Sequence, residues 1–324
     1  MRGLVIATLL LLIVGTAPLR AQERLQFAVI SDENSETLDK IWAPILAGMS
    51  KATGYDVVPL YFNDYAGTVW ALSTKRAQLA WVGNRIAIEA VDHADCEVAV
   101  QIEAVGDVPG YRSLLILKSD SPLSSVDEVM ANARDLSLGF GDRNSTSGYL
   151  MPNYYLFSTK GLNPKDLFRK LSFSNHEANF LAVAQGQIDI AVVGSIYMPV
   201  FKERYPDQFA HIKVIWTSPL IPSEPIVWRK DLPSKAKSAI RAFLLNLGKP
   251  KADKTAGELA EEKTALARLG GSGFRVSDNG QLTETRKIEL YRRKIEMESS
   301  PMDPGLKKTR LDALQKELDQ LQSH

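Results

Sequence analysis

The sequence predicts an α/β protein of two lobes joined by hinge strands and followed by C-terminal helices. Short apolar runs alternate with amphipathic segments over residues 25–232, as in parallel α/β proteins. The run LAWVG at 79–83 is echoed by IAVVG at 190–194, and both runs close on glycine. Two extended segments punctuated by proline, 109–117 and 216–228, have no helical period and suit hinge strands.

Length and charge balance limit the class of protein. At 324 residues, with 45% hydrophobic and 24% charged residues, the chain is long enough for two globular domains. Residues 1–21 hold Arg2 and Arg20 and no acid, so their removal leaves 37 of the 39 basic residues beside 38 acidic ones. This even balance does not suit a polyanionic partner such as nucleic acid.

The N-terminus has the pattern of a secretory signal peptide. Arg2 precedes an apolar core at residues 4–14, and small residues follow up to Ala21. The apolar core is too short for a permanent membrane anchor, so we expect cleavage near Ala21. Cys96 is the only cysteine, which excludes an internal disulfide. The pattern predicts a soluble protein exported to a bacterial periplasm.

The two halves of the chain predict the same order of elements. The first half has expected strands at 25–30, 56–62 and 79–84, with helices at 38–53 and from about 65 to 76. The second half has a strand at 136–140, a polar turn at 141–149, a helix at 150–157 and a strand at 188–194. Between them, Ser174 and Glu177 predict a capping box for a helix that ends at Gly186.

This order assigns residues 22–116 and 222–298 to the first lobe and residues 117–221 to the second. After residue 233 the pattern becomes helical, with helices expected at 236–247, 258–269 and 283–298. Residues 299–324 are a linker and a C-terminal amphipathic helix. Its apolar stripe, which packs on its own lobe or forms a homodimer, consists of Leu311, Leu314, Leu318 and Leu321.

The turn at 141–149, with the sequence GDRNSTSGY, predicts an anion site. It lies between a strand and a helix, where the first amides of the helix have no intrahelical acceptor and the macrodipole is positive. Ser145, Thr146 and Ser147 add hydroxyl donors to those amides. The simpler interpretation is that Ser145 or Ser147 only caps the helix.

The internal echo supplies two further candidates. Eighteen residues before the glycines at 83 and 194 stand Tyr65 and His176, each near the start of a helix. Helix N-termini from two α/β lobes can face each other across a crevice at the carboxyl ends of the strands. The helix dipole disfavours a proton on His176, whereas a bound dianion would favour one, so we expect proton uptake on binding.

Several segments together resemble the periplasmic phosphonate-binding proteins, the solute receptors of phosphonate ABC importers. The resemblance covers about residues 25–232 and is most specific in the Ser-Thr-Ser turn. The matching segments are 64–67, 81–84, 109–111, 141–149, 176–179 and 214–222. The family implies a type II periplasmic-binding-protein fold, a small phosphorus oxyanion as ligand and a permease in the inner membrane as partner.

The resemblance also implies which residues hold the ligand. The phosphonate oxygens would be bound by Ser145, Thr146, Ser147, His176, Tyr65 and Tyr111. In members that take aminoalkylphosphonates, acids meet the amine; here one such position is Glu224 and another is Ile196. Because Ile196 carries no charge, and because Val82 replaces a frequent tyrosine, the resemblance implies phosphite or methylphosphonate. Binding of 2-aminoethylphosphonate or phosphate is the alternative.

Other interpretations remain for these residues. Tyr65 and Tyr111 could be core aromatics, and Glu224 a solvated hinge residue. A serine hydrolase is disfavoured, because the turn lacks the G-x-S-x-G elbow, and a nucleotide site because it lacks a P-loop lysine. The cluster at 92–97 has no second ligand group at zinc spacing. We expect no catalytic residue, cofactor or metal, and a sensory receptor with the same cleft is the third class.

Overall fold

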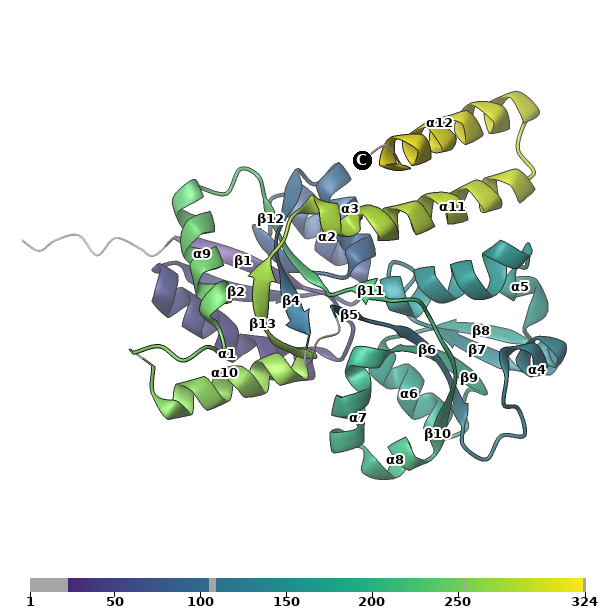
Figure 1. Cartoon of the computed structure of the whole chain (residues 1–324), viewed down its shortest axis with the longest axis horizontal. Coiled ribbons are helices and arrows are strands. Elements are labelled where there is room, and N and C mark those ends of the chain that lie inside the picture. The colour runs from purple at the N-terminus through teal and green to yellow at the C-terminus, as the bar shows by residue number, and fades with distance from the viewer. Residues whose placement is uncertain (1–22, 105–108, 253, 323–324) are drawn as a thin grey trace, which may run out of the picture.

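Two α/β lobes make up the protein, with a helical hairpin at the C-terminus (Figure 1). The structure is a computed structural model, and it describes residues 23–104, 109–252 and 254–322. The predicted signal peptide, residues 1–21, lies outside them. None of the helices in the described part of the chain has the length and apolar character needed to span a bilayer. The predicted two-lobed architecture is confirmed.

The first lobe is built on a six-stranded sheet with the order β13-β4-β12-β3-β1-β2. Its strands are β1 (Arg24–Val29), β2 (Asp56–Tyr61), β3 (Leu79–Trp81), β4 (Cys96–Ala104), β12 (Pro225–Arg229) and β13 (Gly271–Val276). Its helices are α1 (Ser35–Thr53), α2 (Tyr65–Ser73), α3 (Asn84–His93), α9 (Ser234–Asn246) and α10 (Ala256–Arg268). Since β1 is parallel to both β2 and β3, the loops after these three strands lie at one edge of the sheet.

The second lobe is built on a five-stranded sheet with the order β10-β6-β9-β7-β8. Its strands are β6 (Ser113–Lys118), β7 (Ser137–Phe140), β8 (Lys170–Phe173), β9 (Ile190–Gly194) and β10 (Ile212–Thr217). Its α-helices are α4 (Val126–Ala131), α5 (Pro164–Leu167), α6 (His176–Ala184), α7 (Met198–Arg204) and α8 (Pro206–Ala210). Short helical turns are η1 (Ala133–Asp135), η2 (Thr146–Leu150), η3 (Asn153–Phe157), η4 (Ser158–Lys160) and η5 (Ser195–Tyr197).

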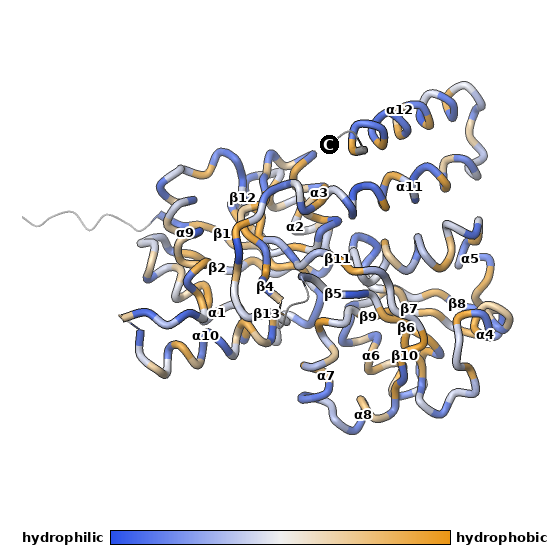
Figure 2. The backbone as a smooth tube through the Cα atoms, viewed as in Figure 1, coloured by the Kyte–Doolittle hydropathy of each residue, from blue (hydrophilic) through white to orange (hydrophobic). Residues whose placement is uncertain are grey.

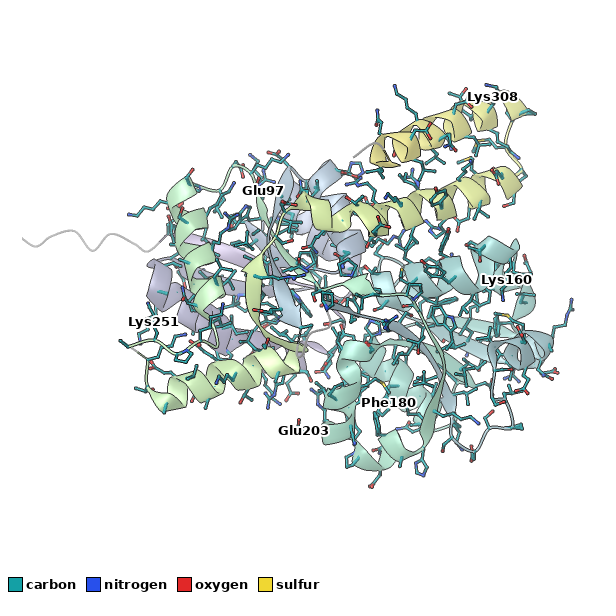
Figure 3. The ribbon with its side chains drawn as sticks, viewed as in Figure 1. Glu97, Lys160, Phe180, Glu203, Lys251 and Lys308 are labelled. Carbon is teal, nitrogen blue, oxygen red and sulfur yellow. The ribbon has the colours of Figure 1, made fainter. Side chains whose placement is uncertain are left out.

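Each lobe has its own apolar core, and many strand residues of both sheets are hydrophobic (Figure 2). In the first lobe Trp42 packs between Phe27 and Trp81, with ring centroids 4.8 and 5.4 Å away. In the second lobe Phe180 lies beside α7 (Figure 3) and stacks on Phe201 at 4.6 Å. Separate cores let each lobe move as a rigid body.

The chain crosses between the lobes between β4 and β6 and between β10 and β12. A small antiparallel pair, β5 (Gly110–Tyr111) with β11 (Ile221–Pro222), lies at the crossing. The crossings are shorter than the hinge segments predicted from the sequence, because β6 and Trp216 belong to the second sheet and Trp228 to the first. The second sheet therefore begins at Ser113, ahead of the boundary expected at residue 117.

Two local predictions were wrong. Strand β13 was expected to be part of a helical region; it is an edge strand whose two glycines leave little apolar alternation in the sequence. The cap of α6 is Asn175, whose side chain accepts from the amide of Ala178 at 2.8 Å, and not Ser174. The carboxylate of Glu177 is thereby free to make contacts with other elements.

The C-terminal helices form a hairpin beside both lobes (Figure 1). After η6 (Asn279–Leu282), helix α11 (Thr283–Ser299) contacts α3 of the first lobe and η4 of the second. Helix α12 (Pro304–Gln322) turns back on α11, and Leu314 and Leu318 bury against Leu290. The leucine stripe of α12 thus packs within its own chain.

Candidate functional site

The turn 141–149 folds back on itself at the end of β7. The amide of Gly141 donates to the carbonyl of Gly148 at 2.8 Å, and a Cβ on Gly141 would lie 2.7 Å from the Cα of Gly148. Only glycine fits that approach. The side chain of Ser145 caps η2 by accepting from the amide of Gly148 at 2.9 Å. Ser145 therefore caps η2 and shapes the turn, and its hydroxyl proton is left as a donor.

Thr146 and Ser147 follow as the first residues of η2, and both are buried (1% and 2% exposed). The hydroxyl oxygen of Thr146 accepts from the amide of Arg85 on α3 of the first lobe at 2.9 Å, which leaves its own proton as a donor. The hydroxyl of Ser147 lies near the phenol of Tyr111. These two hydroxyls stand where the lobes meet.

His176 is the first residue of α6 and is 2% exposed. Its Nδ1 accepts from the amide of Gly194 at 3.1 Å, and its ring stacks on Tyr197 at 4.6 Å. Burial lowers the pKa of the imidazole to about 3. A neutral ring that accepts at Nδ1 carries its proton on Nε2, so His176 is a hydrogen-bond donor without charge. This geometry does not support the expected proton uptake.

Two tyrosines come from the first lobe and the crossing. Tyr65 begins α2, and its amide donates to Asp142 of the second lobe at 3.3 Å. Tyr111 lies on β5, and its phenol donates to Oε1 of Glu224 at 3.4 Å. Burial, followed by the neighbouring carboxylates, raises both phenol pKa values well above 10, so both phenols keep their protons as donors.

Two buried carboxylates, Glu224 and Asp32, complete the site, and only Glu224 was predicted from the sequence. Glu224 is 4% exposed, so it is not a solvated hinge residue. Asp32, in the loop after β1, is 1% exposed and accepts from the phenol of Tyr197 at 2.6 Å. One oxygen of each acid, Oε2 of Glu224 and Oδ1 of Asp32, has no hydrogen-bond partner within the described residues. A buried polar atom without a partner is costly unless a ligand satisfies it.

Burial and neighbouring charges raise the pKa of both acids. Burial and the charge of Glu33 raise the pKa of Asp32 to about 8, and burial and the charge of Asp32 raise that of Glu224. Asp32 and Tyr197 both follow the carboxyl end of a parallel strand, β1 and β9. That position, where ligands gather in α/β sheets, was the signal that could have identified them.

The structure brings all seven predicted residues together between the lobes. Their positions are Ser145, Thr146, Ser147 and His176 on the second lobe, and Tyr65, Tyr111 and Glu224 on the first lobe and crossing. Arg85 is next to this cluster, but its guanidinium is directed to Glu289 and to the carbonyl of Arg143. The donors of the cluster are therefore all uncharged.

Two cavities adjoin the cluster. One of about 640 Å³ lies at the mouth between the lobes, with Glu33 and Asp64 on one wall and Asp142 and Asn175 on the other. The other, of about 10 Å³, is lined by Tyr111, Glu224 and Ile196 and has room for about one water. Ile196 and Glu224 thus line the same small cavity.

The geometry gives no support to a catalytic serine. Within the described residues neither Ser145 nor Ser147 is hydrogen-bonded to His176, whose Nδ1 is occupied by an amide. The described residues also contain no group of three or more His, Cys, Asp or Glu side chains that could hold a metal ion. The arrangement can bind a tetrahedral oxyanion, for which it offers convergent donors.

Comparisons with known proteins agree with this geometry. Residues 27–282 match the family model of the ABC transporter, phosphonate, periplasmic substrate-binding protein. The chain is 38% identical over 312 residues to the phosphonates-binding periplasmic protein of Escherichia coli K12, covering 94% of this chain and 88% of that protein.

Solved structures show the same fold. The binding-protein component of an ABC phosphonate transporter from Pseudomonas aeruginosa is similar with a TM-score of 0.85 and 38% identity, covering 93% of this chain and 97% of that one. A Prochlorococcus marinus protein solved in complex with methylphosphonate has a TM-score of 0.72 at 21% identity, covering 85% and 98%. The fold is that of type II periplasmic binding proteins, and the chain belongs to the non-catalytic, periplasmic substrate-binding proteins of phosphonate ABC transporters.

Proposed function

We propose that the protein captures a phosphonate or phosphite between its lobes and delivers it to an ABC permease in the inner membrane. The observation that carries this proposal is the ring of buried, uncharged donors from both lobes: Ser145, Thr146, Ser147, His176, Tyr65 and Tyr111. Such donors can surround three oxygens of one phosphorus group. The relatives from E. coli and P. aeruginosa, named for phosphonates, support the same ligand class.

The hydrogen bonds of such a site supply enough binding free energy only when water is excluded from it. About five charge-assisted hydrogen bonds at roughly 1.5–3 kcal/mol each give about 7–15 kcal/mol. A micromolar to nanomolar Kd corresponds to about 8–12 kcal/mol. Because donors in an open cleft would exchange these bonds with water at little net gain, closure of the lobes is part of binding.

A second candidate ligand is an aminoalkylphosphonate, and the pair of Asp32 and Glu224 favours it. The resemblance to the family disfavours an amine on the ligand, because Ile196 is uncharged. Asp32, in the loop after β1, supplies a second carboxylate. Among the described residues, one oxygen of each acid has no hydrogen-bond partner. An ammonium group would satisfy both oxygens and allow both acids to ionise. Phosphite or methylphosphonate would instead require the acids to remain protonated.

Calorimetry on the mature protein separates these ligands. We expect phosphorus oxyanions to bind with a change in tryptophan fluorescence, and 2-aminoethylphosphonate to bind more tightly than methylphosphonate if the acids serve an amine. The titrations should include phosphite and phosphate. Binding of none of the four would refute the proposed function, whereas a preference for phosphite or methylphosphonate would refute only the amine subsite.

Export and partners belong to the same proposal. Residues 1–21 would be removed on export, which mass spectrometry of the periplasmic fraction would show as a chain that begins at Gln22. A sensory role with the same cleft predicts no uptake defect on deletion of the gene. A homodimer through the C-terminal helices would double the mass measured by light scattering; the packing of Leu314 and Leu318 on α11 favours a monomer.

A further inference from the structure

A partly buried ionic cluster joins the two lobes beside the ligand site. The loop after β1 in the first lobe contributes Glu33 and Asn34, and α6 and α7 of the second lobe contribute Glu177 and Arg204. Nη1 of Arg204 lies 3.0 Å from Oε2 of Glu33 and 2.7 Å from Oε1 of Glu177. Asn34 donates to the other oxygen of Glu177 at 2.6 Å. One guanidinium thus bridges carboxylates of opposite lobes.

The charges in this cluster depend on one another. Glu33 and Glu177 are 3% and 5% exposed, so their mutual repulsion is poorly screened. Burial raises the pKa of Glu33 although Arg204 opposes it, while hydrogen bonds from Tyr205 and Arg204 keep that of Glu177 low despite burial. Without Arg204, the closed arrangement would leave Glu33 and Glu177 close together with no paired cation, and only the charge of Arg268 would act on Glu33, which is unfavourable.

The cluster is adjacent in sequence to two residues of the site. Glu33 follows Asp32, and Glu177 follows His176. The amide of His176 also donates to the carbonyl of Asp32 across the lobe boundary at 3.2 Å. Because Glu33 and Glu177 are next to Asp32 and His176, a contact that links Glu33 to Glu177 also keeps the His176 imidazole close to the Asp32 carboxylate.

We propose that Arg204 is a closure clasp: its bond to Glu33 forms when the lobes close and positions Asp32 and His176 around the ligand. The clasp rests on the proposed function, because it assigns the closed lobes to ligand capture. On opening, Arg204 keeps Glu177 within its own lobe and Glu33 becomes hydrated. Arg204 is a positioning residue and makes no contact with the ligand.

The test uses Arg204→Met and Glu33→Gln, alone and together, with methylphosphonate and 2-aminoethylphosphonate as probes. Arg204→Met should weaken binding of the tighter probe about 10- to 100-fold, mainly through faster dissociation. Adding Glu33→Gln should recover part of this loss, since it removes the buried charge left unpaired. Arg204→Lys should bind between wild type and Arg204→Met.

The lobe distance provides a readout that a loss of stability would not change. Spin labels at Lys235→Cys and Lys165→Cys, both exposed, report the closed fraction by double electron–electron resonance. Cys96 is buried and does not interfere with labelling. Arg204→Met should lower that fraction with and without probe. Two control variants should leave the closed fraction unchanged. One is Glu203→Gln, at an exposed neighbour on α7 (Figure 3). The other is Arg169→Met, which breaks a 3.2 Å ion pair within one lobe.

The outcomes separate the clasp from the ligand assignment. A closed fraction and an affinity for Arg204→Met equal to those of Glu203→Gln would overturn the clasp, as would a double variant that binds no tighter than Arg204→Met. A wild-type protein that binds no phosphorus oxyanion would refute the proposed function alone. The clasp would then be decided by the closed fraction, which needs no ligand.

Discussion

The two ends of the ligand site differ in how their polar atoms are satisfied. At the donor end, Ser145 caps its own turn, Thr146 accepts from Arg85 and His176 accepts from Gly194. At the acid end, Asp32 and Glu224 are also buried, yet each has one oxygen that finds no partner among the residues the structure describes. A preorganised donor end suits one constant group, the phosphorus oxyanion. The unsatisfied acid end is where substituents would be distinguished.

The largest effect should follow from a loss at the donor end. His176→Ala removes a donor buried between the lobes, and we expect affinity for every phosphorus ligand to fall about 10- to 100-fold, as for a charge-assisted hydrogen bond. The affinity of Ser147→Ala for these ligands should fall at least tenfold. Calorimetry with methylphosphonate measures both. Unchanged affinity in both variants would show that the oxyanion lies elsewhere.

A change at the acid end should be selective. Asp32→Asn removes one charge and keeps the shape of the side chain, so binding of 2-aminoethylphosphonate should weaken about tenfold or more. Binding of methylphosphonate should stay within a few-fold of wild type. Parallel losses for both ligands would mean that the two ends act as one site.

The acid end should also control stability in the ligand-free protein. The pKa of folded Asp32 is about 8 and its ordinary value is near 4, so between these pH values the folded state holds a proton that the unfolded chain has lost. Stability should therefore decrease as the pH rises from about 4 to 8. Asp32→Asn should raise Tm by several degrees at pH 9 and leave it nearly unchanged at pH 4. A difference in Tm that is independent of pH would contradict a titrating Asp32.

The smallest effect is expected for Tyr197→Phe. This change removes the donor to Asp32 and keeps the ring that stacks on His176. Methylphosphonate should bind a few-fold more weakly, because Asp32 then lacks its only described hydrogen-bond partner for that oxygen. An ammonium ligand could replace the lost donor, so 2-aminoethylphosphonate should lose less. The reverse order would place Tyr197 at the donor end.

Much of the donor end could be predicted from the sequence, because its signals are local. The Ser-Thr-Ser turn stands between a strand and a helix, and the helix starts at Tyr65 and His176 follow from spacing alone. Asp32 was missed because a single acid in a polar loop looks like solvated surface. Its burial results from the approach of α6 and η5, which lie more than a hundred residues away along the chain.

The two α/β lobes and the donor turn could be predicted from the sequence alone, because hydrophobic period and glycine placement act within short segments. The sequence did not determine β13, whose edge position shows little apolar alternation. The tautomer of His176, the burial of Asp32 and Glu224 and the bridge made by Arg204 follow only from the folded arrangement. These depend on which groups share a buried space, since burial and neighbouring charge, rather than residue type, set protonation and hydrogen bonding.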